Sequence, residues 1–459
     1  MAIVGGGIAG LAAAYELSRQ QVPFVLLEGG PRLGGVIFSE QIGGFTVDAG
    51  PDSLLVQKAD GIKLCEELGL ADRLIPTSLP RLAYIQRAGR LHALPAASVL
   101  GIPTRVGPFV QTPLFSWSGK LRMAAELAVP ARRDGADESI GAFMTRRFGA
   151  EATTYLAEPL LAGIHAGDVD ALSLQALFPR LAQTERDHGS LLKAFGRERR
   201  PESKDGAFRS LPGGLSDLVT ALERALPARS LRLSAPVAKL VQGADGFRIE
   251  LTSGETLNAS AVVVCTPAYV TAALLRDIDA GLASLCGEIE YASTATVALA
   301  FSRNAVNHPL NGSGFVVPRV ESTGLLAASW LSSKWAHRAP AGHVLMRSFV
   351  GGARDPRALD RSDAELVQTT IDALRPLLGI SGEPIFTRVY RWERKSAQHN
   401  VGHLARIQRI DSVLAAHPRL FVTGSGFRGV GIPDCVADAR ATARKVAECI
   451  RLLPTPVPS

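Results

Sequence analysis

Short apolar runs separated by glycine turns open the chain. Residues 2–4 are apolar, four glycines follow within residues 5–10, and residues 11–17 are again mostly apolar. A short apolar run bounded by a turn is typical of a strand buried on both faces, whereas a longer run favours a helix. The pattern therefore predicts a strand, a tight turn and a helix, followed by a second strand over residues 23–27.

The rest of the chain alternates between strand-like and helix-like segments. Residues 80–200 have a mostly helical pattern that is rich in arginine. A charged, mobile loop is predicted for residues 186–208, which overlap the end of this segment. Strands and helices alternate from 290 to 405. The other predicted strands span residues 45–51, 237–241, 247–251, 261–265 and 420–423, and a last helix spans residues 435–451.

The first turn has the spacing of a dinucleotide-binding motif. Gly5 permits a tight turn, Gly7 lets the backbone approach a pyrophosphate, and Gly10 lets the helix pack closely on the strand. Glu28 ends the second strand near the position of an acid that binds a ribose 2′-hydroxyl, and its charge disfavours the 2′-phosphate of NADP. Glu28 makes a chance strand–turn–helix the weaker interpretation.

The residues after Glu28 add an arginine and a second glycine pair to the motif. Arg32 can supply charge-assisted hydrogen bonds to a pyrophosphate. Gly34 and Gly35 leave room for a bulky ring system to pass over the backbone, which an ordinary NAD enzyme does not need.

Length, composition and charge limit the number of domains and the classes of partner. The 459 residues suggest two or three domains, and no apolar run approaches the roughly 20 residues of a membrane-spanning helix. Five scattered cysteines predict reduced thiols in a cytoplasmic protein with no metal site. Residues 1–4 lead directly into the first strand without the charged and apolar regions of a signal peptide, so none is expected in this sequence. The net charge of +7 fits an acidic small molecule or an anionic membrane surface, and no nucleic-acid motif accompanies it.

Several motifs in the second half resemble one branch of the flavoproteins. They are Gly-Ile-His-Ala-Gly-Asp at 163–168, Leu-Pro-Gly-Gly-Leu at 211–215, Gly-Ser-Gly-Phe-Val-Val-Pro at 312–318, and Gly-Ser-Gly-Phe-Arg-Gly-Val-Gly-Ile-Pro-Asp-Cys at 424–435. Together they resemble the FAD-dependent protoporphyrinogen and coproporphyrinogen oxidases of haem biosynthesis, within the amine-oxidase-like superfamily. The resemblance covers nearly the whole chain.

The resemblance implies an α/β fold with α+β elements. A Rossmann-like FAD-binding domain is expected from residues 1–75, 205–270 and 405–459. Residues 80–200 would form a mostly helical, membrane-associating domain, and residues 271–404 the substrate-binding domain.

The resemblance also implies the site residues. Noncovalent FAD would be held by Gly5, Gly6, Gly7, Ile8, Ala9, Gly10, Glu28, Arg32, Gly34, Gly35, Gly50, Pro51, Val237, Trp392, Val430, Gly431 and Ile432. The positive dipole end of the last helix would stabilise negative charge on the reduced flavin ring. Arg81 would hold a propionate of the substrate and Gly163 would line the substrate site. Plain core packing is the alternative for Ile432, and a solvated surface residue for Arg81.

The chemistry that this family implies is three rounds of two-electron oxidation of a porphyrinogen, with O2 as acceptor and H2O2 as product. The expected partners are the porphyrinogen, O2, a membrane surface, and a haem-pathway enzyme such as ferrochelatase. The sequence departs from the family pattern at two places. Residues 397–399 are Ala-Gln-His where Pro-Gln-Tyr is usual, and residue 165 is a histidine, which we interpret as a structural residue. An amine oxidase, a carotenoid desaturase and a non-catalytic FAD-binding protein remain open as alternatives.

Overall fold

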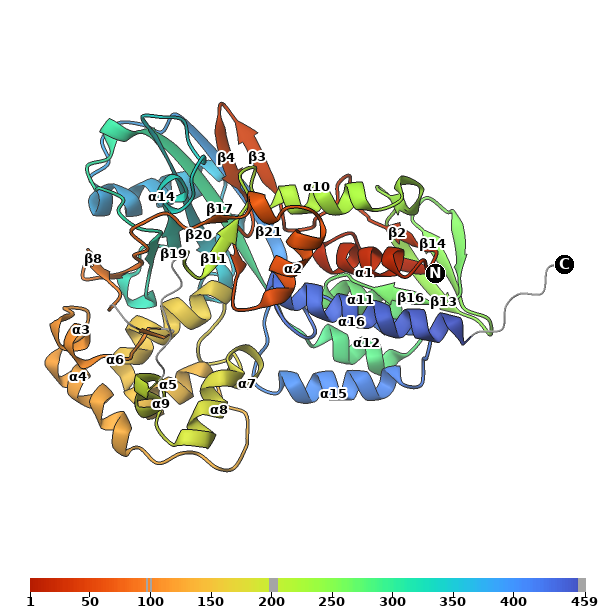
Figure 1. The fold of residues 1–459 in the computed structure, drawn as a ribbon, viewed down its shortest axis with the longest axis horizontal. Helices are drawn as coiled ribbons and strands as arrows, with labels where there is room; N and C mark the ends of the chain where they lie inside the picture. The colour runs from red at the N-terminus through yellow and green to blue at the C-terminus, as the bar shows by residue number, and fades with distance from the viewer. Residues whose placement is uncertain (96–97, 100, 198–204, 453–459) are drawn as a thin grey trace.

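The computed structural model describes residues 1–95, 98–99, 101–197 and 205–452. Residues 198–204 of the predicted charged loop lie outside the described residues. The molecule is elongated, with a parallel sheet and its helices at the end near the N-terminus (Figure 1). A second, larger sheet and a group of short helices occupy the other end (Figure 1).

The first lobe is built on a five-stranded parallel sheet, which we call the parallel sheet. Its strand order is β12-β2-β1-β16-β22. The strands are β12 (Leu231–Arg232), β2 (Val25–Leu27), β1 (Ala2–Val4), β16 (Val262–Val264) and β22 (Leu420–Val422). Every residue of β1 and β16 is buried, which explains their uninterrupted apolar sequences. The chain leaves this sheet several times and returns to it.

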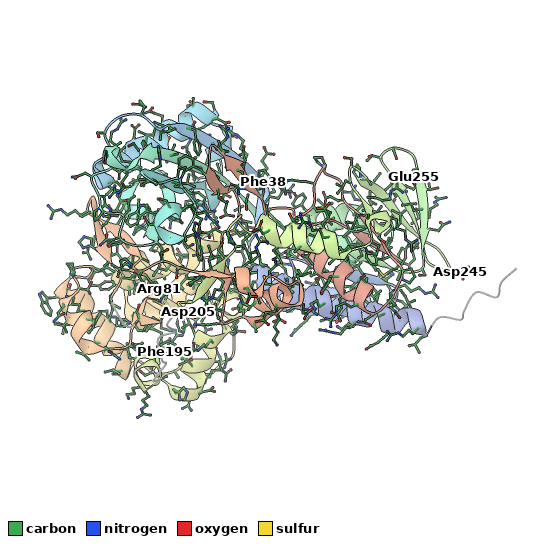
Figure 2. All side chains as sticks on the ribbon, turned by 45° about the horizontal axis from the view of Figure 1, so that its top comes forward. Phe38, Arg81, Phe195, Asp205, Asp245 and Glu255 are labelled. Carbon is green, nitrogen blue, oxygen red and sulfur yellow. The ribbon has the colours of Figure 1, made fainter. Side chains whose placement is uncertain are left out.

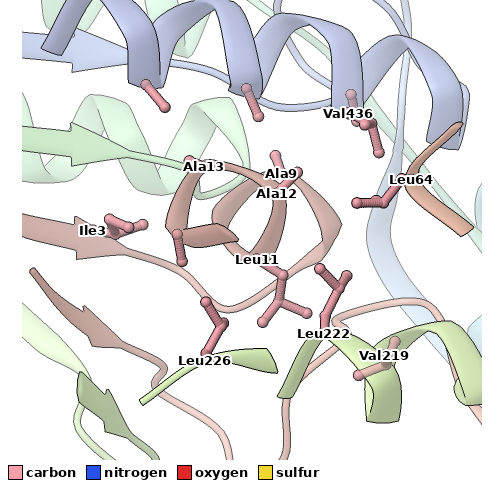
Figure 3. Close-up of a cluster of buried hydrophobic side chains, with 14 of the residues drawn as sticks. Ile3, Ala9, Leu11, Ala12, Ala13, Leu64, Val219, Leu222, Leu226 and Val436 are labelled. Carbon is pink, nitrogen blue, oxygen red and sulfur yellow. The ribbon is translucent and has the colours of Figure 1, made fainter. Parts of the chain in front are cut away.

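Both faces of the parallel sheet are covered. On one face α1 (Ile8–Arg19) lies between α10 (Ser216–Ala225) and α16 (Ile432–Arg451), and small alanine side chains of α1 allow close packing (Figure 3). The other face is covered by a three-stranded antiparallel sheet and three helices. These are β13 (Val237–Gln242), β14 (Phe247–Leu251), β15 (Thr256–Ala259), α11 (Ala268–Leu275), α12 (Ala280–Gly287) and α15 (His403–Leu414). The sequence pattern missed β15, because Thr256 and Asn258 interrupt its apolar character.

The second lobe contains a seven-stranded sheet in the order β21-β17-β20-β19-β18-β7-β8. Its strands are β21 (Phe386–Ala397), β17 (Tyr291–Ser302), β20 (His343–Gly351), β19 (Leu325–Ser329), β18 (Gly314–Val316), β7 (Tyr84–Arg87) and β8 (Arg90–Ala93). Only the β18–β7 pair is parallel among the pairs of this sheet in the described chain. Helix α14 (Asp363–Leu378) packs on one face over a large apolar cluster.

The helical group packs beside the seven-stranded sheet. It comprises α3 (Val106–Gln111), α4 (Trp117–Ala124), α5 (Ile140–Phe148), α6 (Ala150–Ala152), a π-helical segment Thr153–Ala162, the turn Gly163–His165, α7 (Leu174–Leu177), α8 (Pro179–His188) and α9 (Leu191–Arg197). No helix in the described ranges is long and apolar enough to cross a membrane.

The structure differs from the predicted pattern at both ends of the helical segment. Its first residues form β7 and β8, because Tyr84, Ile85 and Gln86 are buried as successive residues of a strand with covered faces. Near its other end, α9 occupies part of the segment that was predicted as a loop, because Leu191 and Phe195 are buried in the helical core.

Two small sheets join the lobes. The hairpin β3 (Ser39–Ile42) and β4 (Phe45–Asp48) places Phe45 and Val47 against the seven-stranded sheet. The second small sheet has the order β5 (Leu54–Leu55), β11 (Phe208–Ser210), β6 (Ile75–Pro76). The segment between β4 and β5 therefore passes directly between the two lobes.

Candidate flavin site

The glycine turn after β1 has a geometry that only glycine allows at two positions. Gly5 has a φ of +105°, in the region that side chains disfavour. A Cβ at Gly10 would collide with the carbonyl oxygen of Gly5, so helix α1 approaches the turn too closely for any other residue. A Cβ at Gly7, in contrast, would meet no atom within 4 Å in the described part of the chain. The turn therefore presents open backbone beside the N-terminus of α1.

Glu28 lies at the end of β2 and faces this turn. Its Oε2 accepts a hydrogen bond of 2.6 Å from the backbone N–H of Gly6, and its Oε1 accepts one of 2.7 Å from Gly30. A carboxylate oxygen can accept more than one hydrogen bond, so each oxygen retains capacity for a ribose hydroxyl. The backbone N–H of Ser234 donates to the carbonyl of Gly30, and that of Ala235 donates to the carbonyl of Glu28. These bonds bring the start of β13, with Val237 at its first position, to the same edge of the lobe.

Arg32 shapes the loop that carries the second glycine pair. Its guanidinium donates to the carbonyls of Leu33 at 3.1 Å, Ile37 at 3.2 Å and Gly35 at 2.7 Å. It also lies 4.6 Å from the ring centre of Phe38, which Figure 2 labels between the two lobes. In this structure the donors of Arg32 are directed to the loop, and its predicted contact with a pyrophosphate remains a prediction.

The second glycine pair lies against the first turn. The N–H of Gly34 donates to the carbonyl of Gly6 at 2.8 Å, and a Cβ at Gly35 would lie 3.3 Å from the Cα of Gly7. Both Gly34 and Gly35 have positive φ. The two glycine segments thus form one continuous backbone surface without side chains.

The Gly50–Pro51 turn lies where the lobes meet. A Cβ at Gly50 would collide with the carbonyl oxygen of Val36, so this turn packs directly on the loop described above. From the seven-stranded sheet, the Nε1 of Trp392 donates to the carbonyl of Ala49 at 3.1 Å and contacts the hydroxyl of Thr296 at 3.2 Å. The indole ring therefore lies beside Gly50, and its contact with the flavin stays a prediction.

The sequence did not predict a group of buried charged residues that surrounds this turn. Arg347 donates to the carbonyls of Asp48 and Gly50. Asp52 accepts from the Nζ of Lys334 at 2.7 Å and the Nε1 of Trp335 at 2.9 Å. Burial alone would raise the pKa of Asp52, but the charges of Lys334 and Arg347 hold it below its usual value. The signal available in the sequence was an arginine within the mostly apolar strand β20.

The N-terminus of α16 is the third part of the site. Gly431 precedes the first turn of this 20-residue helix and no side chain caps the turn. Its free N–H groups and positive dipole end can accept an anion or a polarised carbonyl. Val430 and Gly431 are accessible, whereas Ile432 is buried in the core beneath α1, which is the packing role that the sequence left open.

The predicted substrate residues lie on the side of the helical group. The Nε of Arg81 donates to the carbonyl and the hydroxyl of Thr77 at 3.1 and 3.2 Å, and it lies 2.7 Å from the position of a Cβ built at Gly206. Gly163 ends the π-helical segment, and the following Ala166 accepts from the N–H of Ala353 at 2.8 Å. The helical group therefore contacts the end of strand β20 next to Gly163.

Three histidines occupy the region where the sequence departs from the family pattern. The rings of His399 and His403 stack at 3.8 Å, and their Nε2 atoms bond to the carbonyls of Ser425 and Phe427. Burial lowers the pKa of His399 to about 3 and that of His165 to about 4, so both rings are neutral at physiological pH. The Nδ1 of His165 is buried without a hydrogen-bond partner among the described residues.

Comparison with known proteins identifies the family. The model of the flavin-containing amine oxidoreductases matches residues 8–447. The chain belongs to this family. It is 38% identical to the coproporphyrinogen III oxidase of Bacillus subtilis over 96% of each chain, and 32% identical to that of Staphylococcus aureus over 97% of this chain and 98% of the other. A putative protoporphyrinogen oxidase from Exiguobacterium superposes with a TM-score of 0.88 at 34% identity, covering 97% of this chain and 98% of that one.

The structure of this flavin-containing amine oxidoreductase fits its cofactor, FAD. The uncovered backbone at Gly7 leaves a space that a side chain would fill, and Glu28 supplies free lone pairs at one end of that space. At the other end lie Trp392, the Gly50–Pro51 turn and the dipole of α16. These features are spread along the lobe as an extended dinucleotide requires.

Proposed function

We propose that this protein is an FAD-dependent porphyrinogen oxidase that acts on coproporphyrinogen III with O2 as acceptor. The observation that carries the proposal is the similarity to coproporphyrinogen III oxidases at 32–38% identity over nearly the whole chain. The chloroplast protoporphyrinogen oxidase of Arabidopsis thaliana is less similar, at 28% identity. That difference favours the substrate with four propionates over the one with two.

The residues of this chain have binding and positioning roles in the proposed reaction. FAD, when bound, supplies an acceptor of two electrons, and oxidation of a porphyrinogen removes six electrons and six protons. The two glycine segments hold the dinucleotide, Glu28 the ribose, Val237 the adenine, and the N-terminus of α16 the polar edge of the ring. Arg81 pairs with a propionate by a charge-assisted hydrogen bond, and Gly163 lines the substrate site.

Porphyrin fluorescence provides the test of this function. The purified protein is mixed in air with coproporphyrinogen III or protoporphyrinogen IX, and H2O2 is measured alongside. We expect coproporphyrin III with about three H2O2 for each porphyrin, and a higher kcat/KM for coproporphyrinogen III. Release of H2O2 from alkyl amines but not from porphyrinogens would show an amine oxidase instead. A yellow protein that oxidises neither would be a non-catalytic flavoprotein.

A membrane surface is the second partner that we propose. Five exposed apolar residues lie on α3, α4 and the turn after α4: Val106, Val110, Trp117, Leu121 and Leu127. We call them the α3–α4 patch. Lys120 links the two helices by donating to the carbonyl of Val110, and Arg105 and Arg122 are exposed next to the patch. Apolar side chains with basic neighbours suit peripheral contact with the anionic cytoplasmic face of a membrane.

The patch differs in detail from the apolar stretches 94–100 and 108–115, which the sequence favoured for this contact. Leu114 and Phe115 are buried in the helical core, and residues 96, 97 and 100 lie outside the described residues. Transfer of the product to an enzyme such as ferrochelatase remains a prediction.

A further inference from the structure

The turn between β4 and β5 has backbone carbonyls that are satisfied from the opposite lobe. A buried carbonyl needs a hydrogen-bond partner, and three successive carbonyls of this turn find theirs in two side chains of the seven-stranded sheet. Arg347 on β20 donates from a single Nη1 to Asp48 and Gly50, at 2.6 Å in both cases. Trp392 on β21 donates to Ala49 between them.

The side chains of the turn are held from the same lobe. Asp52 is buried between Lys334, Trp335 and Arg347, and the Nη2 of Arg347 lies 3.4 Å from the Oδ1 of Asp52. The carboxylate of Asp48 forms an ion pair of 3.0 Å with Arg338, and both side chains are inaccessible to solvent. A buried ion pair is costly to break, because the remaining charge has no solvent. The turn is therefore bonded to the second lobe through both backbone and side chains, and the Oδ1 of Asp48 also accepts from the Ser39 hydroxyl at 2.6 Å and the Leu215 N–H at 3.1 Å.

Arg347 occupies the central position in this arrangement. It is 2% exposed, and its guanidinium lies 4.7 Å from the ring centre of Phe349, two residues along the same face of β20. The planar guanidinium can bond two carbonyls and a carboxylate together, which a lysine ammonium on a flexible stem cannot reproduce. Arg347 is thus the side chain of the sheet that bonds the Gly50 carbonyl, next to the bond from Trp392 to Ala49.

We propose that Arg347 is a positioning residue for the flavin: it fixes the Gly50–Pro51 turn on the seven-stranded sheet, so that cofactor and substrate surfaces keep one relative position. The proposal rests on the placement of FAD at this turn. Removing Arg347 takes away its hydrogen bonds to the carbonyls of Asp48 and Gly50 and so loosens the Gly50 end of the turn, while the contacts of Trp392, Lys334 and Arg338 with the turn remain. Without Arg347, FAD affinity and turnover decrease, whereas the substrate contacts at Arg81 and Gly163 are unchanged.

The test compares Arg347→Lys with Arg354→Lys. Arg354 is a matched control, because its side chain is only 8% exposed, donates to the carbonyl of Val317 and pairs with Glu158 at 3.0 Å. No contact between Arg354 and the turn is seen among the described residues. We expect Arg347→Lys to weaken FAD binding by roughly 10- to 100-fold, as loss of one or two charge-assisted hydrogen bonds implies. Its flavin absorption bands should shift, and kcat should fall with little change in KM. Arg354→Lys should alter neither FAD affinity nor the absorption spectrum.

Trp392→Phe keeps an aromatic ring but removes Nε1, and with it the hydrogen bond to Ala49 and the contact with Thr296. It provides a second test of the attachment of the turn if Arg347→Lys does not fold. A several-fold weaker FAD affinity is expected for it. The proposal is overturned if Arg347→Lys, or the folded Trp392→Phe variant in its place, binds FAD with the wild-type affinity and spectrum. FAD affinity is measured without porphyrinogen, so failure of the proposed reaction would not be confused with failure of this proposal.

Discussion

A side chain at Gly7 would point into open space, and this makes the position a clean test of the dinucleotide site. Gly7 is the N-cap of α1, with extended φ and ψ that serine also adopts, and serine is a good N-cap residue. Gly7→Ser should therefore leave the unfolding midpoint of the FAD-free protein unchanged or higher. It should weaken FAD binding by roughly 10- to 100-fold, because Cβ and Oγ enter the space for the pyrophosphate. Flavin fluorescence titration measures the affinity.

Gly107→Ser is the control for that substitution. Gly107 lies on α3, also has no atom within 4 Å of a built Cβ in the described chain, and has no positive φ. Its FAD affinity should equal that of the wild type. If Gly7→Ser binds FAD with the wild-type affinity, the pyrophosphate does not lie beside Gly7.

Arg81 tests the proposed propionate contact at the same scale. If a charge-assisted pair holds the propionate, Arg81→Ala should weaken substrate binding by roughly 1.5–3 kcal/mol, about 10- to 150-fold in KM. Arg81→Lys should recover only part of the loss, since an ammonium lacks the planar two-point contact. Arg90→Ala, at an exposed position on β8, is the control. Steady-state kinetics with a wild-type KM in Arg81→Ala, or loss of its flavin, would contradict this role.

At the scale of elements, the histidine pair at the end of β21 predicts a pH dependence of stability. The folded protein keeps His399 neutral, because burial lowers its pKa from 6.5 to about 3, whereas the unfolded chain protonates near pH 6.5. Stability is therefore lost as the pH falls below 6.5, by about 1.4 kcal/mol for each pH unit and residue. His399→Gln can still donate to the carbonyl of Ser425, and it should flatten the decrease in unfolding free energy between pH 7.5 and 5.5. Urea denaturation measures this slope.

His188→Gln is the control, because His188 is exposed at the end of α8. Its slope should match that of the wild type. An unchanged slope in His399→Gln would mean that other groups cause the acid sensitivity.

The α3–α4 patch predicts membrane binding at the element scale. Trp117 and Leu121 are 67% and 71% exposed and lie one helical turn apart, so they share one face of α4. We expect the protein to sediment with vesicles of anionic lipid and to be released by salt. Trp117→Asp combined with Leu121→Asp should abolish sedimentation without changing turnover of the substrate in detergent. Ile385→Asp, at another exposed apolar position just before β21, should not affect it, and vesicle binding that survives the double change would contradict the assignment.

At the scale of the whole molecule, local patterns predicted the elements better than their long-range contacts. The glycine turn, Glu28 and the buried strands were predictable, because spacing and apolar runs act within a few residues. The attachment of the Asp48–Asp52 turn was not, because its partners Arg347 and Lys334 are about 300 residues away in the chain and one acid or arginine carries no local signal of its partner. Strand β7 was missed for a similar reason: its burial depends on pairing with β18, more than 200 residues later.

The dispersed site makes FAD a link between distant parts of the chain. The residues proposed to contact FAD, near Gly7, Glu28, Val237 and Gly431, come from four segments of the chain. We expect noncovalent binding, because the region around Gly426 carries no cysteine that could form a covalent bond to the flavin ring. Acid precipitation should release FAD into the supernatant. Because FAD binds only the folded chain, the unfolding midpoint should rise with free FAD, by about 2.7 kcal/mol of stability at 100 times Kd. A chromophore that stays in the acid pellet, or an unfolding midpoint that added FAD does not change, would show that this link is covalent or absent.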